Sequence, residues 1–197
     1  MTLTRTLVAL AITAACGAAF AQAGTIQRNV NQQERIEQGL KSGELTTREA
    51  ARLEKEESRV EKMQSNVMRD GNITPEERAR LDRAQDKVSQ DIYQEKHDAQ
   101  KGNPNSASSQ RMQADVQRNI NQQQRIEQGV KSGQLTTREA GRMERNQARV
   151  NQREARAGRD GNVSAREQHG IQRAENRDSR QIYRQKHDGQ VRHHRRS

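Results

Sequence analysis

The side chains with the clearest potential for chemistry are arginines in the second half of the 197-residue chain. They recur every three or four residues, so a helix over this segment would carry them on one face. A row of guanidinium groups favours an anionic partner, because each offers several N–H donors to phosphate or carboxylate oxygens. The alternative interpretation is a solvated helix face. The candidate residues are Arg142, Arg145, Arg149, Arg153 and Arg156, with Arg159 continuing the row.

Histidines are the next groups to consider. His187, His193 and His194 lie in or beside a basic C-terminal tail, and neutral imidazoles there would bind Zn²⁺, Ni²⁺ or Cu²⁺. His97 and His187 are each followed by Asp and fall where a helix is expected to end, a position that favours a cation. We therefore expect helix capping from His97 and His187, with a metal site in the tail as the alternative.

Catalytic motifs are not evident. The single cysteine, Cys16, lies near the N-terminus, and no serine stands in a G-x-S-x-G elbow. Phosphate-binding, dinucleotide-binding and HExxH zinc patterns are also missing from the sequence. The carboxylates of Glu54, Glu56 and Glu57 are expected on the surface of a helix, paired with Lys and Arg. We predict a protein that is not an enzyme and that has no cofactor.

An internal repeat must position these side chains. Residues 26–100 align without a gap with residues 116–190, at an offset of 90 and with roughly half of the positions identical. The segment between them is rich in Gly, Pro, Asn and Ser, which predicts a flexible linker. The predicted divisions are a signal peptide (1–21), helical repeat 1 (22–100), a linker (101–115), helical repeat 2 (116–190) and a basic tail (191–197).

Each repeat contains three blocks of apolar residues at helical spacing, separated in repeat 1 by Lys41–Glu44 and by Asp70–Asn72. A capping box, Ser/Thr-x-x-Glu, follows every break and predicts the start of a helix. The pairs are Thr46 with Glu49, Thr74 with Glu77, Thr136 with Glu139, and Ser164 with Glu167. The predicted fold is all-α, with two tandem helix-turn-helix-turn-helix units joined by the flexible linker after the signal peptide.

Composition limits the core. Only 29% of the residues are hydrophobic and 2% are aromatic, against ~45–50% apolar residues in an average globular protein. The helices must therefore pack through narrow aliphatic seams. The net charge of +10 is uneven, because residues 26–100 contain 14 Lys and Arg against 16 Asp and Glu, whereas residues 116–190 contain 16 against 9. Because repeat 2 has also lost apolar residues, for example Val88 to Asp178, we expect it to be the less stable repeat.

The N-terminus has the three-part pattern of a secretory signal peptide. Arg5 precedes an apolar stretch, and small residues allow cleavage after Ala21 or Ala23. Lipid attachment at Cys16 is the alternative. No later segment is apolar enough to cross a membrane, so we expect a periplasmic or secreted protein. Export and the scarcity of aromatic residues disfavour a nucleic-acid partner.

Three resemblances add expectations. The segment Asp70–Glu77 resembles the second half of an EF-hand loop, which implies Ca²⁺ ligands at Asp70, Thr74 and Glu77. Asn66 and Met68 stand where the loop's first acidic ligands belong, and repeat 2 has Arg156 and Gly158 there. A glycine turn followed by a capped helix explains the same residues without an ion.

The segments RIEQGLKSGELTTREAARLE, RDGNITPEERARL and IYQEKHD resemble small exported proteobacterial proteins that have no assigned activity. Residues 45–49 and 73–77 are similar to the LTxxQ motif of the Spy/CpxP family, with Glu in place of Gln. That family implies a periplasmic role in holding unfolded clients. We expect an exported, non-enzymatic helical binding protein, an envelope-stress or client-holding factor. The alternatives are a degenerate EF-hand-like Ca²⁺ module and a binder of anionic envelope surfaces such as phospholipid or lipopolysaccharide head groups. Oligomerisation stays open.

Overall fold

The computed structural model describes the backbone of residues 7–188 and the side chains of residues 22–188, and this part of the chain is helical with no strand. The predicted all-α class is therefore confirmed. None of the helices described is both long and apolar enough to cross a membrane. The helices are α1 (Leu7–Ser42), α2 (Thr47–Val67), α3 (Pro75–Lys96), α4 (Ala107–Lys131), α5 (Thr137–Ala157) and α6 (Ala165–Lys186), with a short 3-10 helix, η1 (Gly158–Asp160), after α5.

The predicted capping boxes are all present. Thr46, Thr74, Thr136 and Ser164 precede α2, α3, α5 and α6, and in each case the Glu three residues later completes the reciprocal pair. In the first box the Thr46 amide donates to Glu49 Oε2 at 2.8 Å, and the Glu49 amide donates to Thr46 Oγ1 at 3.2 Å. These bonds satisfy backbone N–H groups that a helix start otherwise leaves without partners.

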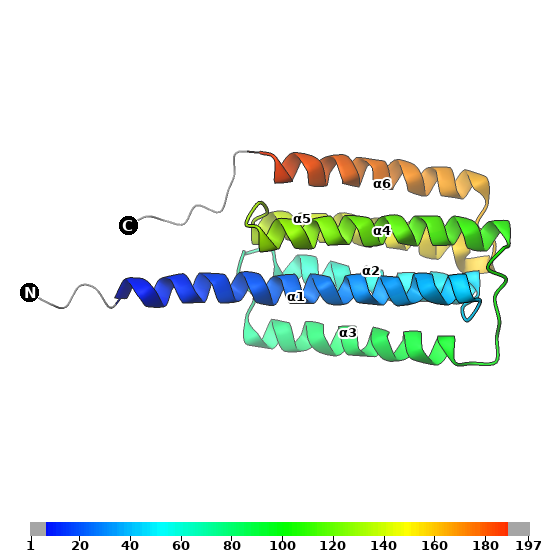
Figure 1. The fold of residues 1–197 in the computed structure, drawn as a ribbon, viewed down its shortest axis with the longest axis horizontal. Helices are drawn as coiled ribbons and strands as arrows, with labels where there is room; N and C mark the ends of the chain where they lie inside the picture. Colours follow the sequence, from blue (N-terminus) through cyan, green and yellow to red (C-terminus); the bar gives the residue numbers. More distant parts are fainter. Residues whose placement is uncertain (1–6, 189–197) are drawn as a thin grey trace, which may run out of the picture.

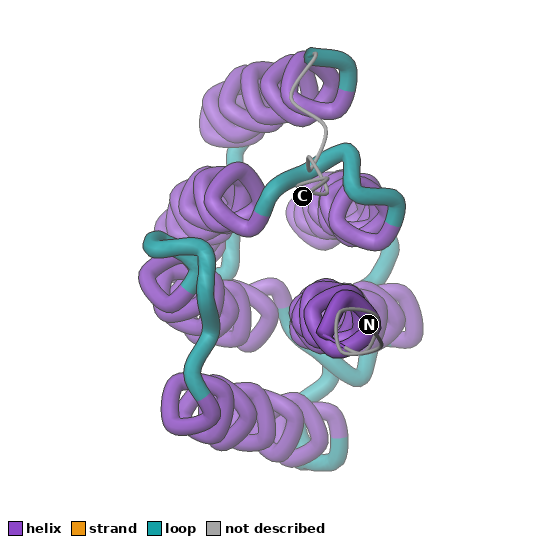
Figure 2. Tube along the Cα trace, turned by 90° about the vertical axis from the view of Figure 1, so that its left-hand side faces the viewer, coloured by secondary structure: helices purple, strands orange, loops and turns teal. Residues whose placement is uncertain are grey.

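The two repeats pack against each other through equivalent helices. The contacts of α2 are most extensive with α5, its counterpart at the offset of 90, and the contacts of α1 are most extensive with α4. These four helices form the centre of the molecule. Helix α3 covers one side of them and α6 covers the opposite side (Figures 1 and 2).

Hydrogen bonds between the repeats follow an internal pseudo-two-fold axis. Arg48 donates to the backbone oxygen of Asp160 at 3.0 Å, and its counterpart Arg138 donates to the backbone oxygen of Asp70 at 3.2 Å. The side chains of Gln124 and Glu34, which are counterparts of each other, are linked at 3.4 Å and so lie at the axis. Each repeat therefore presents the same surface to the other, as the subunits of a symmetric dimer do.

The interior combines aliphatic seams with a buried polar network. Ile36, Leu53 and Ile126 are at most 1% exposed, as the apolar spacing predicts. Glu54 and Glu57 are 0% exposed, so the expectation that they lie on a surface is wrong. They lie on the side of α2 that faces the centre, where Gln33 of α1 donates to Glu54 Oε2 at 3.0 Å.

Two predicted boundaries differ from the structure. Residues 107–115, expected to be flexible linker, form the first turns of α4, and Ser106 caps this helix by accepting from the Ser109 amide. The remaining linker is held in place, because the Gly102 amide donates to the Gly43 oxygen at 2.9 Å. Helix α1 begins at Leu7 and runs through Ala21 and Ala23, so the first helix starts earlier than the apolar blocks indicated.

Candidate anion-binding face

The outer sides of α2 and α5 together form a basic face. Glu56 of α2 is partly exposed, but the exposed charged side chains of these two helices all belong to Lys or Arg. From α2 they are Arg48, Arg52, Lys55, Arg59 and Lys62, and from α5 they are Arg138, Arg142, Arg149, Arg153 and Arg156, with Arg145 partly exposed. We call this set the α2–α5 face.

Helical geometry separates the charges. The cations of α2 recur at intervals of three or four residues and so lie along one side of the helix. Glu54, Glu57 and Glu61 follow the same interval on the opposite side and are at most 1% exposed. In α5, Glu144 and Glu154 are likewise 0% exposed. Apart from Glu56, the acids of the two helices therefore point inward, and the bases point outward.

A groove lies between the two rows of cations. It has a volume of about 360 Å³, and its basic lining comes from Arg48, Arg52 and Lys55 on the α2 side and from Arg156 and Arg159 on the α5 side. Ala51 and Ala155 also line the groove, and their small side chains leave it open between the longer basic side chains. The guanidinium and ammonium groups that line it are donors suited to an anionic group such as a phosphate ester.

Burial lowers the negative charge that would otherwise offset this face. It raises the pKa of Glu54 to about 7 and that of Glu144 to about 8, from an ordinary value of 4.5. Burial also raises the pKa values of Glu57, Glu61 and Glu154 well above 4.5, and neighbouring carboxyls raise them further. Uncharged acids leave most of the outer cations uncompensated near neutral pH, whereas Arg52 pairs with Glu95 of α3 at 3.3 Å.

Amide side chains stabilise the buried carboxyls. Gln123 of α4 donates to Glu61 Oε1 at 2.9 Å and to Glu144 Oε2 at 3.2 Å, so it joins acids from both repeats. Asn119 donates to both oxygens of Glu154, at 3.0 and 2.8 Å. These bonds satisfy part of the network and fix the inward rotation of α2 and α5.

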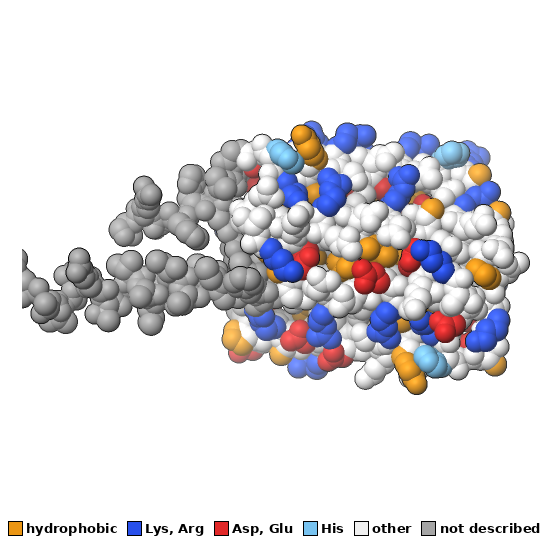
Figure 3. Space-filling model, viewed as in Figure 1, with side chains coloured by type: hydrophobic (Ala, Val, Ile, Leu, Met, Phe, Trp, Pro, Cys, Tyr) orange, Lys and Arg blue, Asp and Glu red, His pale blue; other side chains and the backbone are white. Residues whose placement is uncertain are grey.

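Other faces of the molecule are mixed in charge. Figure 3 shows the face formed by α1, α3, α4 and α6, where acidic and basic side chains are interspersed. Ion pairs there include Arg28 with Asp86 and Lys131 with Glu127. The α2–α5 face therefore differs from this face in charge pattern as well as in position.

The structure places the predicted arginine row, Arg142 to Arg156, along the outside of α5, as the sequence spacing indicated. The matching row on α2 was missed. Its signal was present in the sequence, because Arg48, Arg52, Lys55 and Arg59 align at the offset of 90 with Arg138, Arg142, Arg145 and Arg149. The balanced charge of repeat 1 concealed the row, since burial of the acids could not be read from a net count.

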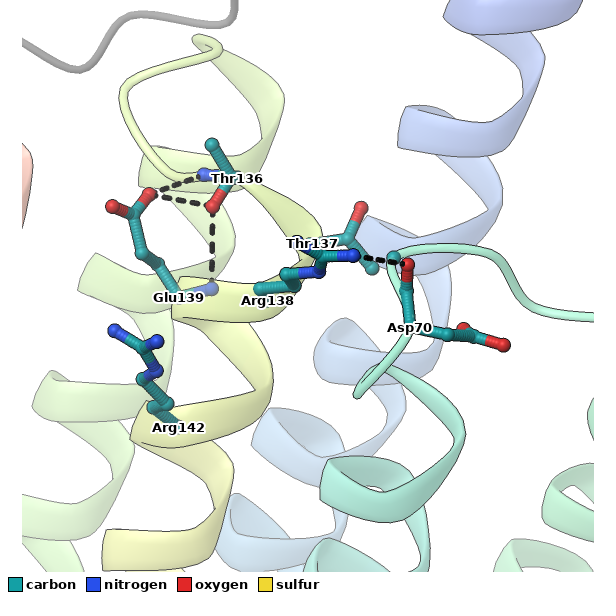
Figure 4. A pocket seen from close by; sticks show the side chains of 7 residues that line it. Asp70, Thr136, Thr137, Arg138, Glu139 and Arg142 are labelled. Carbon is teal, nitrogen blue, oxygen red and sulfur yellow. Dashed lines mark hydrogen bonds between the residues drawn. The ribbon is translucent and has the colours of Figure 1, made fainter.

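The EF-hand-like residues take part in local turn contacts. Glu77 Oε2 accepts from the Thr74 amide at 3.0 Å, and Asp70 Oδ1 accepts from the Asn72 amide at 2.9 Å. A pocket of about 520 Å³ lies beside Asp70, and in Figure 4 the Arg138 guanidinium points at the backbone of Asp70 from across this pocket. Arg138 thus occupies the backbone oxygen of Asp70, while the Asp70 carboxylate points away from it (Figure 4).

Two of the described histidines act as helix caps, as expected. His97 and His187 are the C-caps of α3 and α6, and each stacks on a tyrosine one turn earlier, with centroids 4.0 and 4.1 Å apart. His193 and His194 lie outside the described residues. The metal site predicted in the tail therefore stays a prediction.

Comparison of the chain with protein-family models, with curated proteins and with solved structures finds no match. The functional argument therefore rests on the residues and their geometry.

Proposed function

We propose that this chain is an exported, non-enzymatic protein that binds anionic surfaces of the cell envelope through the α2–α5 face. The observation that carries the proposal is the separation of charge on α2 and α5, whose exposed charged side chains are all basic while Glu54, Glu57 and Glu144 are buried. The partner's chemistry is that of closely spaced phosphate groups, as on anionic phospholipid or lipopolysaccharide head groups.

The energetics support binding by charge. Each Lys or Arg near an anionic membrane surface contributes about 1 kcal/mol, so a row of cations on each of two helices suffices for stable attachment. The large apolar side chains exposed in the described part of the chain are Met63, Tyr93 and Tyr183, and of these only Met63 belongs to α2 or α5. The protein would therefore rest on the surface without inserting, and salt would weaken its binding.

Client holding, the role implied by the Spy/CpxP resemblance, receives less support. A surface that holds unfolded chains presents apolar area, and the three exposed apolar side chains named above do not form a patch on one helix pair. Binding of anionic surfaces remains the function that the geometry favours.

Charge reversal tests the proposal. Arg142 and Arg156 are exposed on the α2–α5 face, and Arg80 and Arg83 are exposed on α3. Two double variants are compared. The first combines Arg142→Glu with Arg156→Glu, and the second combines Arg80→Glu with Arg83→Glu. Both alter the net charge equally, so only the place of the change differs. The chain from Gln22 onwards would be sedimented with vesicles of anionic phospholipid and with neutral phosphatidylcholine vesicles.

We expect the first double variant to bind anionic vesicles at least about thirty-fold more weakly, because the loss of two favourable contacts costs about 2 kcal/mol or more. The α3 variant should change binding by less than about three-fold, and neutral vesicles should not be bound. Equal loss in both double variants, or equal binding to neutral vesicles, contradicts the proposal. Circular dichroism of each variant checks that the helices are kept.

A further inference from the structure

Three carboxylates of repeat 1 meet where α2 begins and α3 ends. Glu49 stands in the first turn of α2, Glu95 in the last turn of α3, and Asp98 follows the C-cap His97. One carboxylate oxygen from each residue lies within 4.8 Å of the other two. Among the residues that the structure describes, this is the one set of three acidic, His or Cys side chains brought so close.

The carboxylate of Glu49 has an oxygen without a partner. Glu49 is 2% exposed, and its Oε2 completes the capping box with Thr46. Its Oε1 is buried and has no hydrogen-bond partner. A buried carboxylate oxygen in this state is costly unless a donor or a cation satisfies it. This oxygen belongs to the same carboxylate that meets Glu95 and Asp98, so a cation bound among the three carboxylates would lie close to it.

The neighbouring side chains supply little positive charge. Arg52 Nη1 lies 3.3 Å from Glu95, and Lys96 instead pairs with Glu44 at 3.1 Å. Asp98 accepts two bonds from Gln100, one from its backbone amide and one from its side chain. Burial, together with Glu49 and Asp98, raises the pKa of Glu95 against the effect of Arg52. One guanidinium thus faces three carboxylates.

The equivalent position in repeat 2 has one carboxylate fewer. The counterparts of Glu49, Glu95 and Asp98 at the offset of 90 are Glu139, Gln185 and Asp188. The Gln185 amide donates to Asp188 Oδ2 at 3.0 Å, a bond that a carboxylate at this position cannot make. In repeat 1 Glu95 stands where that amide donor would be, so its carboxylate and that of Asp98 repel each other unless a cation lies between them.

We propose that Glu49, Glu95 and Asp98 form a binding site for one divalent cation of the oxygen-preferring class, with Ca²⁺ as the best fit. Carboxylate oxygens are the ligands that hard cations prefer, and Ca²⁺ tolerates irregular geometry and completes its shell with water, whereas Mg²⁺ requires a near-ideal octahedron. The ion joins the start of α2 to the end of α3. Arg52 of the α2–α5 face contacts Glu95, but none of the three ligands belongs to that face, so the site is tested independently of the proposed function.

The test compares the full chain with Glu95→Gln, which copies the arrangement of repeat 2 and so preserves folding. Isothermal titration with CaCl₂ measures binding, and thermal denaturation followed by circular dichroism measures the effect on stability. Gln185→Glu, which places a third carboxylate in repeat 2, is the converse variant. Asp70→Asn is the control for the EF-hand-like segment.

We expect one Ca²⁺ per wild-type chain and a rise in Tm of roughly 5–10 °C at a concentration about 100 times Kd. Glu95→Gln should bind about ten-fold more weakly or not at all, Gln185→Glu should gain a second ion, and Asp70→Asn should bind as the wild type does. No heat of binding and no Tm shift in the wild type would overturn the proposal. Undiminished binding by Glu95→Gln, or binding lost in Asp70→Asn, would overturn it as well.

Discussion

Glu57 illustrates at the scale of single residues how the interior controls the surface. Both of its carboxylate oxygens are buried without a hydrogen-bond partner, and burial, then Glu54 and other acids, raise its pKa well above 4.5. Its counterpart in repeat 2 is Gln147, which donates to Gln122 at 2.6 Å. The core therefore accepts an uncharged group at this position in both repeats, a protonated acid in one and an amide in the other.

The raised pKa values predict stability that depends on pH. Because the folded state binds protons more tightly than the unfolded chain, the contribution of these carboxyls is complete below about pH 4.5 and is lost as pH rises through about 7–8. We expect the Tm to fall by roughly 5–10 °C between pH 6 and pH 9, measured by circular dichroism. A Tm that rises over this range would contradict the assignment of protonated acids to the core.

Glu57→Gln tests the same point at one residue. It removes one titrating group and keeps the volume of the side chain, so the Tm should rise at pH 9 and change little at pH 5. Glu76→Gln, at an exposed position in the first turn of α3, is the control; it loses a weak interaction with the helix N-terminus and should lower the Tm by at most about 2–3 °C, equally at both pH values. Equal effects of the two substitutions would mean that the burial of Glu57 has no energetic consequence.

At the scale of helices, close approach of α2 and α5 depends on glycine at two related positions. A Cβ atom on Gly141 would lie 2.8 Å from Met68 Cβ, and one on Gly158 would lie 2.8 Å from Ala51 Cβ. At the offset of 90, Gly141 aligns with Ala51 and Gly158 aligns with Met68. In each contact, repeat 2 supplies the glycine that makes room for the side chain of repeat 1.

Gly158→Ala should therefore destabilise the protein by about 1–3 kcal/mol, because the Ala51 Cβ cannot rotate away from the added methyl group. Gly170→Ala is the control, since Gly170 lies within α6 and a Cβ there would meet nothing within 4 Å. Alanine is the better helix former, so this control should stabilise the fold by about 0.5–1 kcal/mol. Urea denaturation measures both changes. A Gly158→Ala variant as stable as the wild type would show that the two helices do not approach so closely.

The helices themselves could be predicted from the sequence, but their partners could not. The capping boxes at Thr46, Thr74, Thr136 and Ser164 are local interactions, so four residues suffice to recognise each one. Burial of Glu54 depends on Gln33 and on the packing of α2 against a helix 90 residues away. Residue spacing was enough to predict the arginine row of α5. The row of α2 was missed because the net charge of repeat 1 includes acids that the fold buries.

At the scale of the whole molecule, the two repeats form one structure. Since the most extensive contacts run between α2 and α5 and between α1 and α4, neither repeat keeps its packing when the other unfolds. We expect a single calorimetric transition, with a ratio of calorimetric to van't Hoff enthalpy of about 1. The sequence expectation that repeat 2 is less stable would instead give two transitions, the first from residues 116–190.

The shared interface also explains how two repeats of unlike charge produce one basic face. Residues 26–100 contain more acids than bases, yet they contribute Arg48, Arg52, Lys55, Arg59 and Lys62 to that face. The burial of Glu54, Glu57 and Glu61 in the centre makes this possible. The proposed anion binding is thus assigned to the assembled bundle, because neither repeat alone presents both rows.

Lysine footprinting of the native chain tests this central claim most directly. Lys55 and Lys62 are exposed on the α2–α5 face, whereas the side chains of Lys87 on α3 and Lys131 on α4 are 71% and 51% exposed on other faces. The chain would be acetylated with and without anionic phospholipid vesicles, and mass spectrometry would compare the four lysines. The account predicts strong protection of Lys55 and Lys62, unchanged reactivity of Lys87 and Lys131, and loss of protection at high salt. Equal protection of all four lysines, or protection of Lys87 and Lys131 instead, would contradict it.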